Sequence, residues 1–174
     1  MDTTMSENAY SDEEPLFANL RDGDPALAVA RFEAQDRLPQ FKAAFPARRF
    51  RSAAFVVKVP FVDRSAVGEP ALAGTTEVIA ENPKRPIAHL WLGVTSIDDD
   101  LLFCSVLEAP KPLGLSKGDC FVILEEMVED WMILHQGVAY GGFSMRVLRD
   151  RLGEIEKRRF DEHTGIREFR QDMP

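Results

Sequence analysis

Short segments in which apolar and polar residues alternate dominate the sequence between residues 54 and 148, and turn-forming residues separate them. In the segment AAFVVKVPF, every second residue from Phe55 to Phe61 is apolar, which is the period of a strand with one buried face. Pro60 lacks a backbone N–H, so this strand is predicted to lie at an edge or to end its pairing there. A small sheet of this kind must close or be covered to hide its edges.

Four further strands are predicted along the chain. They cover residues 87–97, 101–108, 120–127 and 129–148. The turn-forming run Asp98–Asp100 makes the first two of these a hairpin, and the last bends near His135–Gly137. Within it, Phe143, Met145 and Val147 are expected to face the core.

One helix is predicted before the strands. Asp24 is a suitable N-cap and Pro25 suits the first helical position. A single apolar stripe follows, at Leu27, Ala30, Ala34 and Leu38. Pro39 is expected to end or kink this helix, with a short helical turn after it.

This order predicts an α+β fold. The N-terminal helix would pack on a small, strongly bent antiparallel sheet or partly open barrel of about five strands, followed by a helical C-terminal tail. The predicted divisions are a flexible acidic leader (1–22), one domain (24–152) and a charged, partly helical tail (153–174). A long loop is expected over 64–87, with a short strand candidate at 75–80.

Charge and composition exclude several classes of protein. The net charge is −8, of which −6 falls in residues 1–24, so little net charge remains for the rest of the chain. Without a basic excess, binding to nucleic acid is not expected. No apolar run is long enough for a membrane span, and the acidic N-terminus is no secretory signal. Cys104 and Cys120 are therefore expected to be free thiols in the cytoplasm.

One constellation of polar and aromatic side chains could form a binding site. Lys58, His89 and Trp91 are expected on the face opposite the apolar stripe of their strands, and Arg146 on the corresponding face of the last strand. Asp130 and Trp131 of the EDWM stretch could join them. Cations and an indole together suit an anionic or planar ligand. The alternative is structural: a Trp and a His under a covering helix, Asp130 bonded to backbone N–H groups, and Trp131 in the core.

Motifs of known chemistry are not apparent. The sequence contains no nucleophile elbow, phosphate-binding glycine loop or dinucleotide fingerprint, so no cofactor is expected. The three histidines have no zinc-ligand spacing with the cysteines, and Asp98–Asp100 lacks the rest of a calcium loop. No metal site is predicted.

Several segments together resemble the bacterial DUF2314 family, a domain of unknown function found in small cytoplasmic proteins. They are ARFEAQDRLPQF, VVKVPFVD, AHLWLGV, GLSKGDC, EDWMI and GGFSMRVL, and the resemblance covers about residues 28–152. Ala88 stands where the family tends to have a glutamate before the histidine, which weakens a carboxylate–histidine pair. Ile133 and Phe143–Ser144 also depart from the family pattern, and the 64–87 loop is longer.

The sequence favours a noncatalytic binding or interaction module. Its partner would be an unknown protein or a small anionic ligand, and the chain a monomer or small homo-oligomer. One alternative is a small enzyme that uses His89 as acid and base, with Lys58 or Arg146 in support. Another is a structural, oligomer-forming subunit.

Overall fold

The computed structural model describes residues 24–47, 50–62, 87–108 and 115–173. The acidic leader, the strand candidate at 75–80 and nearly all of the expected 64–87 loop lie outside these residues.

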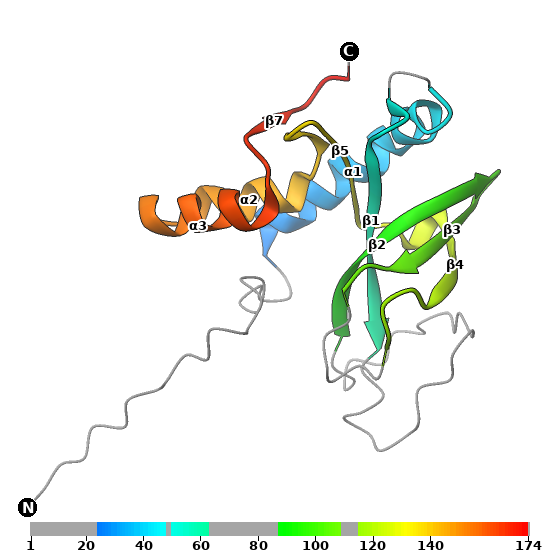
Figure 1. Ribbon diagram of the computed structural model, residues 1–174. Coiled ribbons are helices and arrows are strands. Elements are labelled where there is room, and N and C mark those ends of the chain that lie inside the picture. Colours follow the sequence, from blue (N-terminus) through cyan, green and yellow to red (C-terminus); the bar gives the residue numbers. More distant parts are fainter. Residues whose placement is uncertain (1–23, 48–49, 63–86, 109–114, 174) are drawn as a thin grey trace, which may run out of the picture.

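Seven strands form one sheet in the order β4-β3-β2-β1-β5-β6-β7 (Figure 1). They are β1 (Ala54–Val62), β2 (Ile87–Asp98), β3 (Leu101–Val106), β4 (Cys120–Leu124), β5 (Asp130–His135), β6 (Val138–Gly141) and β7 (Glu168–Arg170). Neighbours are antiparallel except β6 and β7, which run parallel. The sheet is mixed and unclosed. Together with the three α-helices, it confirms the predicted α+β class. The strand number exceeds the expected five, partly because the C-terminal tail contributes β7.

Three α-helices accompany the sheet: α1 (Pro25–Ala44), α2 (Phe143–Arg151) and α3 (Glu154–Thr164), and a 3-10 turn lies at Glu125–Met127. Helix α1 begins as predicted, because the Asp24 carboxylate accepts the Ala26 N–H at 2.9 Å. The tail is helical only over α3.

Helix α1 continues through Pro39 to Ala44, so the expected end at the proline is wrong. The residues beyond the proline extend the buried stripe: Phe41 and Ala44 are buried in line with Leu38. Phe41 lies 5.4 Å from the Trp131 ring. An interior proline costs about 3 kcal/mol, and this burial is what offsets it.

Residues 143–151 form helix α2, so the strand predicted after Gly142 is also wrong. The N–H groups of Phe143 and Ser144, which a helix leaves without partners in its first turn, are accepted by the buried Asp130 carboxylate at 3.1 and 2.7 Å. A carboxylate at the start of a helix also faces the positive end of its dipole. This long-range cap favours a helix where alternation alone indicates a strand.

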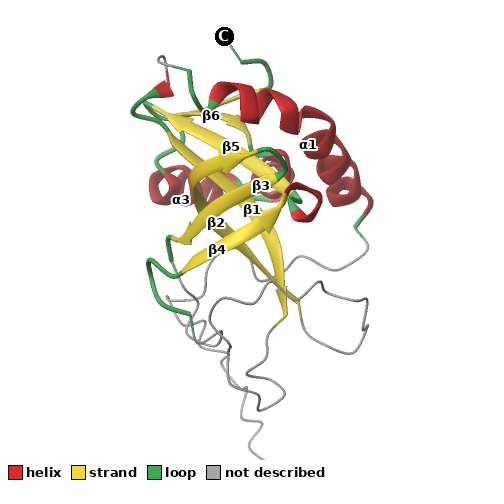
Figure 2. Cartoon of the chain, turned by 90° about the vertical axis from the view of Figure 1, so that its right-hand side faces the viewer, coloured by secondary structure: helices red, strands yellow, loops and turns green. Residues whose placement is uncertain are grey.

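The sheet buries side chains on both faces. Its inner face packs against α1 and carries the main core, including Val57, Leu92 and Trp131. On the outer face, Ile166 and Phe169 from the C-terminal segment pack with Val56 and Met132. Figure 2 shows α1 and α3 on different sides of the strands. Helix α1 therefore covers the face opposite to that of Lys58 and Trp91.

Two glycines end the β5–β6 hairpin in left-handed backbone. Gly141 and Gly142 have φ of +79° and +65°. A Cβ at Gly141 would lie 2.4 Å from the Trp131 carbonyl oxygen and 2.5 Å from the Trp131 ring. Positive φ at both residues and the close approach of Trp131 to Gly141 explain why glycine stands here.

The Gly141→Ala variant is expected to lose about 3 kcal/mol or more of unfolding free energy, because backbone and a buried indole must both shift. Gly165→Ala is the matched control: its φ is +68°, but nothing lies within 4 Å of the added carbon. That control should lose only about 1 kcal/mol. Urea denaturation measures both, and equal losses would contradict the steric role of Trp131.

Candidate functional site

Strand register brings three of the predicted site residues side by side. Lys58 of β1 lies opposite Trp91 of β2 on one side and Asp130 of β5 on the other. His89 precedes Trp91 by two residues and so shares its face of the sheet. The predicted grouping of these residues on the outer face is therefore present. His89 is exposed there, whereas Lys58 and Trp91 are partly buried.

Glu129 joins this group, although the sequence analysis did not select it. Its carboxylate lies 2.6 Å from His89 Nδ1 and 3.2 Å from Arg31 Nη1. We call Arg31, Lys58, His89 and Glu129 the polar cluster. Ala88 provides no carboxylate for His89, and Glu129, the residue just before β5, supplies one instead. The glutamate of the EDWM stretch was visible in the sequence, but only the strand register places it beside His89.

Burial and charge act against each other in the polar cluster. Burial by itself raises the pKa of Glu129, but the hydrogen bond with His89 and the charges of His89, Arg31 and Lys58 outweigh it, and the net shift is downward. Burial lowers the pKa of Lys58, although Glu129 and Asp130 oppose this. Among the described residues, the Lys58 ammonium forms no salt bridge. Within the part of the chain that the structure describes, the cluster therefore holds one cation without a direct ion-pair partner.

Asp130 and Trp131 are fully buried. Asp130 accepts hydrogen bonds from the backbone N–H of Trp131, Phe143 and Ser144 and from the Ser144 hydroxyl. Burial raises the pKa of Asp130 in spite of these bonds. Trp131 points to the inner face, where its indole N–H donates to the Ala34 carbonyl at 2.8 Å. These contacts give both residues a structural role within the fold.

Arg146 lies on helix α2 and not on a strand. Its guanidinium sits 5.5 Å from the centre of the Phe143 ring and 5.7 Å from that of Phe169. It also donates to the Arg170 carbonyl, and its buried Nε has no hydrogen-bond partner among the described residues. Arg146 thus fastens the C-terminal segment to α2, and its hydrogen bond and ring contacts among the described residues do not involve His89 or Lys58.

A second feature is a hollow of about 550 Å³ between β1 and β2, which we call the β1–β2 crevice. Strand β2 pairs with β1 only as far as Gly93, opposite Val56. Beyond Gly93, among the described residues, it pairs with β3 alone and leans away from β1 (Figure 1). The crevice is lined mostly by apolar residues. They come from the turn after α1, the start of β1, and the facing parts of β2 and β3.

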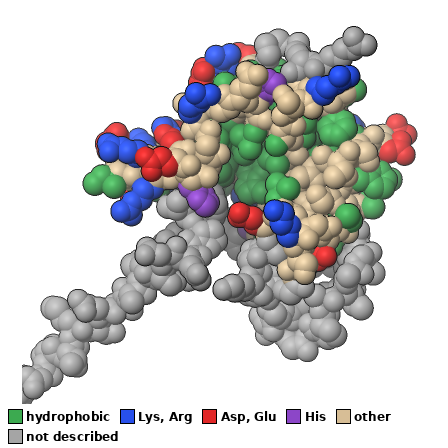
Figure 3. Space-filling model, viewed as in Figure 1, with side chains coloured by type: hydrophobic (Ala, Val, Ile, Leu, Met, Phe, Trp, Pro, Cys, Tyr) green, Lys and Arg blue, Asp and Glu red, His purple; other side chains and the backbone are tan. Residues whose placement is uncertain are grey.

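Exposed apolar side chains continue from the crevice onto the neighbouring strands. Leu107 lines the crevice and is 42% exposed. Phe103 and Val122 lie opposite each other on β3 and β4 and are also exposed. Figure 3 shows further hydrophobic side chains in the hollow between the helices and the β2–β3 hairpin. We call Phe103, Leu107 and Val122 the apolar patch. Contiguous exposed apolar area of this kind marks interaction sites.

The described residues contain no group of three or more His, Cys, Asp or Glu side chains placed to hold a metal ion. No helix among them is both long and apolar enough to cross a membrane.

Comparison with known proteins identifies the family. Residues 24–169 match the family described as an uncharacterized protein conserved in bacteria, DUF2314. The chain belongs to this family. The match covers both helices that Asp130 and Trp131 hold, and β7 as far as residue 169.

A curated relative is a putative ankyrin repeat protein of Neisseria meningitidis serogroup B, which is 26% identical to this DUF2314 chain over 112 residues. The alignment covers 64% of this chain and 38% of the relative, so the chain spans well under half of that protein. No solved structure matches the chain.

The Glu129→Gln variant tests the polar cluster through pH. A carboxylate with a lowered folded pKa stabilises the fold above about pH 4.5, and this contribution is lost as the pH falls through the folded value. At neutral pH we expect the variant to be less stable by about 1 kcal/mol. The difference should shrink in acid.

Urea denaturation at several pH values measures the difference. Glu126→Gln, an exposed neighbour in the 3-10 turn, serves as the control. A Glu129→Gln difference that stays constant from neutral to acid pH would rule out the ion pairs as its cause.

Proposed function

We propose that this DUF2314 domain is a noncatalytic interaction module that binds a partner protein through the β1–β2 crevice and the adjoining apolar patch. The crevice carries the proposal. Its volume of about 550 Å³ lies within the range of binding pockets, and such pockets are mostly apolar with a few polar groups. Here the polar groups include Arg51, Thr95 and Ser105.

The apolar patch supports a protein partner over a small molecule. Phe103, Leu107 and Val122 extend the apolar surface well beyond the crevice mouth. An interface needs a buried apolar centre with a polar rim, which a broad patch beside a hollow can supply. A small ligand would leave this patch in water.

The relative adds independent support. It is named as an ankyrin repeat protein, and ankyrin repeats stack into extended concave binding surfaces. Likeness to a protein of that name supports a binding role for the present domain. We also assign the module to the cytoplasm, because Cys104 and Cys120 are both free thiols.

Leu107→Asp is expected to weaken partner binding at least tenfold, because a charge at the crevice mouth would have to be desolvated in the complex. Ile155→Asp is the matched control, since Ile155 is an exposed apolar residue on α3, away from the crevice. Both variants should fold normally. The measurement is quantitative capture of bacterial proteins on the immobilised full chain, read by mass spectrometry.

Proteins that bind the wild type and Ile155→Asp but not Leu107→Asp are the expected partners. If every captured protein binds the two variants equally, the crevice is not the binding site.

A second candidate function is the binding of a small anion at the polar cluster. The observation that favours it is the ammonium of Lys58, which lacks a salt bridge among the described residues and lies near the Arg31 guanidinium. The bond from Nδ1 of His89 to Glu129 leaves Nε2 available to a ligand.

Inorganic phosphate is the probe for this candidate. We expect millimolar binding in an NMR titration, at least tenfold weaker in Lys58→Met, because the Lys58 ammonium would supply the main attraction for the anion. Lys117→Met, at an exposed lysine before β4, should bind as the wild type does. An unchanged affinity in Lys58→Met would remove the polar cluster as an anion site.

A further inference from the structure

A β-bulge explains why β2 leaves β1. In the β2–β3 pairing, Val94 lies opposite Cys104 and Ser96 opposite Phe103, so Thr95 is an extra residue without an opposite partner. The Thr95 hydroxyl donates to the Phe103 carbonyl at 3.0 Å, which holds the bulge toward β3. A bulge bends its strand and increases the local twist. Strand β2 therefore turns away from β1 at a bulge that lies two residues beyond Gly93, the last residue that pairs with β1.

The divergence leaves two strand edges facing the crevice. Ala54 and Phe55 of β1 pair only with β5 among the described residues. Residues 94–98 of β2 pair only with β3 in the same part of the structure. In an antiparallel ladder, every second residue directs its N–H and C=O away from the existing partner strand. The edge of β2 therefore presents backbone donors and acceptors in and beside the crevice, which Val94 and Thr95 line.

We propose that the β1–β2 crevice accepts an extended segment of the partner protein, which pairs along the 94–98 edge of β2 as an added strand. This inference rests on the proposed function and names the class of partner. Added strands gain affinity from main-chain hydrogen bonds and specificity from pockets for alternate side chains. Of the two edges that lack a second partner strand in the described part of the chain, the 94–98 edge is the longer, which selects β2 over β1.

The lining of the crevice defines the chemistry of the segment. Phe45, Pro46 and Phe50 form an apolar wall across from Val94 and Leu107. Gly93 forms part of the floor, and a Cβ there would lie 2.9 Å from Leu107 Cδ2. Leu107 therefore lies directly over the point where the strands part. Apolar side chains at alternate positions of the segment fit this lining.

Arg51 adds a charge requirement. It is exposed at the rim and is the one Lys, Arg, Asp or Glu among the described residues that line the crevice. A carboxylate of the partner would pair with it. The expected segment therefore has alternating apolar residues and an Asp or Glu at the end near Arg51.

A displayed library of random 12-residue peptides, selected on the immobilised full chain, is the direct test. We expect enriched peptides with apolar residues at alternate positions and at least one acid. Their binding should be lost with Leu107→Asp and kept with Ile155→Asp. In hydrogen exchange, amides within residues 94–98 should gain protection when a peptide binds.

Backbone pairing is tested separately by N-methylation of one enriched peptide, one position at a time. Pairing with a single edge uses every second N–H of the peptide. We therefore expect alternating results: methylation weakens binding about tenfold or more at one set of positions and has little effect at the others. Uniform tolerance, or binding only by helical peptides, would overturn the strand proposal.

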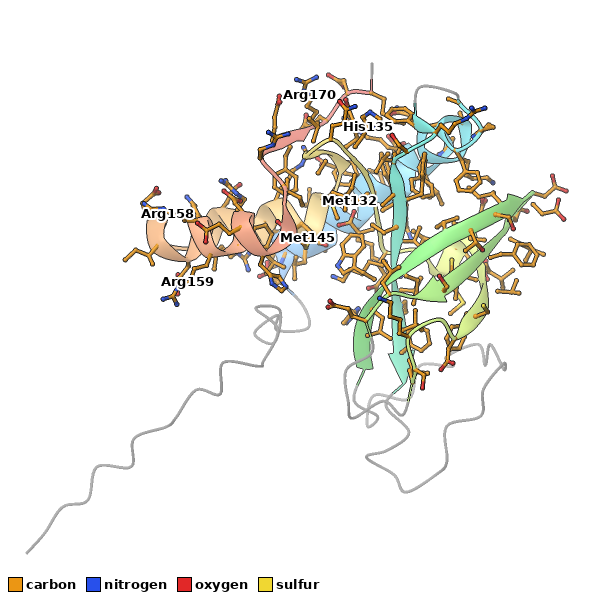
Figure 4. The ribbon with its side chains drawn as sticks, in the orientation of Figure 1. Met132, His135, Met145, Arg158, Arg159 and Arg170 are labelled. Atoms are coloured by element: carbon orange, nitrogen blue, oxygen red, sulfur yellow. The ribbon has the colours of Figure 1, made fainter. Side chains whose placement is uncertain are left out.

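The charge requirement has its own control. Arg51→Ala should weaken binding of an acidic peptide about two- to fivefold, as expected for an exposed ion pair. Arg158→Ala should have no effect, since Arg158 lies far along α3 and points away from the sheet (Figure 4). An equal effect of both variants would overturn the assignment of Arg51.

The two levels of the proposal fail in different ways. If Leu107→Asp removes peptide binding but the N-methyl pattern is uniform, the crevice binds a partner and the added strand is wrong. If selected peptides bind Leu107→Asp as tightly as the wild type, the proposed function fails together with this inference.

Discussion

Two neighbouring residues of β5, Asp130 and Trp131, connect the sheet to two of the helices. Trp131 points to the inner face of the sheet, where its indole N–H bonds to the Ala34 carbonyl of α1. Asp130 points to the outer face and caps α2 through the N–H groups of Phe143 and Ser144. Because adjacent strand residues alternate between faces, the two side chains of this dipeptide each hold a different helix, and Phe143 of α2 packs against the Trp131 ring. Gly141, which ends β6, leaves room for the same indole, because a Cβ at this position would clash with the Trp131 ring.

Local pattern predicts the parts of the fold that depend on local physics. Alternation places the inner-face residues of β1 and β2 correctly, and Asp24–Pro25 marks the start of α1. The errors occur where a distant contact decides. Residues 143–148 alternate like a strand but form a helix capped by Asp130, and burial of Phe41 carries α1 through Pro39.

The same division applies to the candidate site. Period-two alternation was sufficient to group Lys58, His89 and Trp91 on one face. It could not place Glu129 beside His89, because that contact depends on the register between β1 and its two neighbours. Nor could it place the crevice, which arises from one extra residue in β2. Met132 of β5 and Met145 of α2 lie where the helices meet the sheet (Figure 4). These two elements come together through the strand register and the Asp130 cap, which local pattern does not reveal.

Separate contacts stabilise the two groups of strands on either side of the crevice, which explains how an open crevice is compatible with a stable fold. Strands β1 and β5, held by α1 and α2, contain the fully buried Val57, Trp131 and Ile133. Beyond the bulge, β2 is secured by β3 and β4, whose Leu102 and Ile123 are buried in the same core. The start of β1 and residues 94–98 of β2 therefore need no pairing with each other. Without the extra residue Thr95, β2 would continue along β1 and close the gap. The bulge thus exchanges a few ladder hydrogen bonds, each worth about 1 kcal/mol net, for a surface that an extended partner can complete.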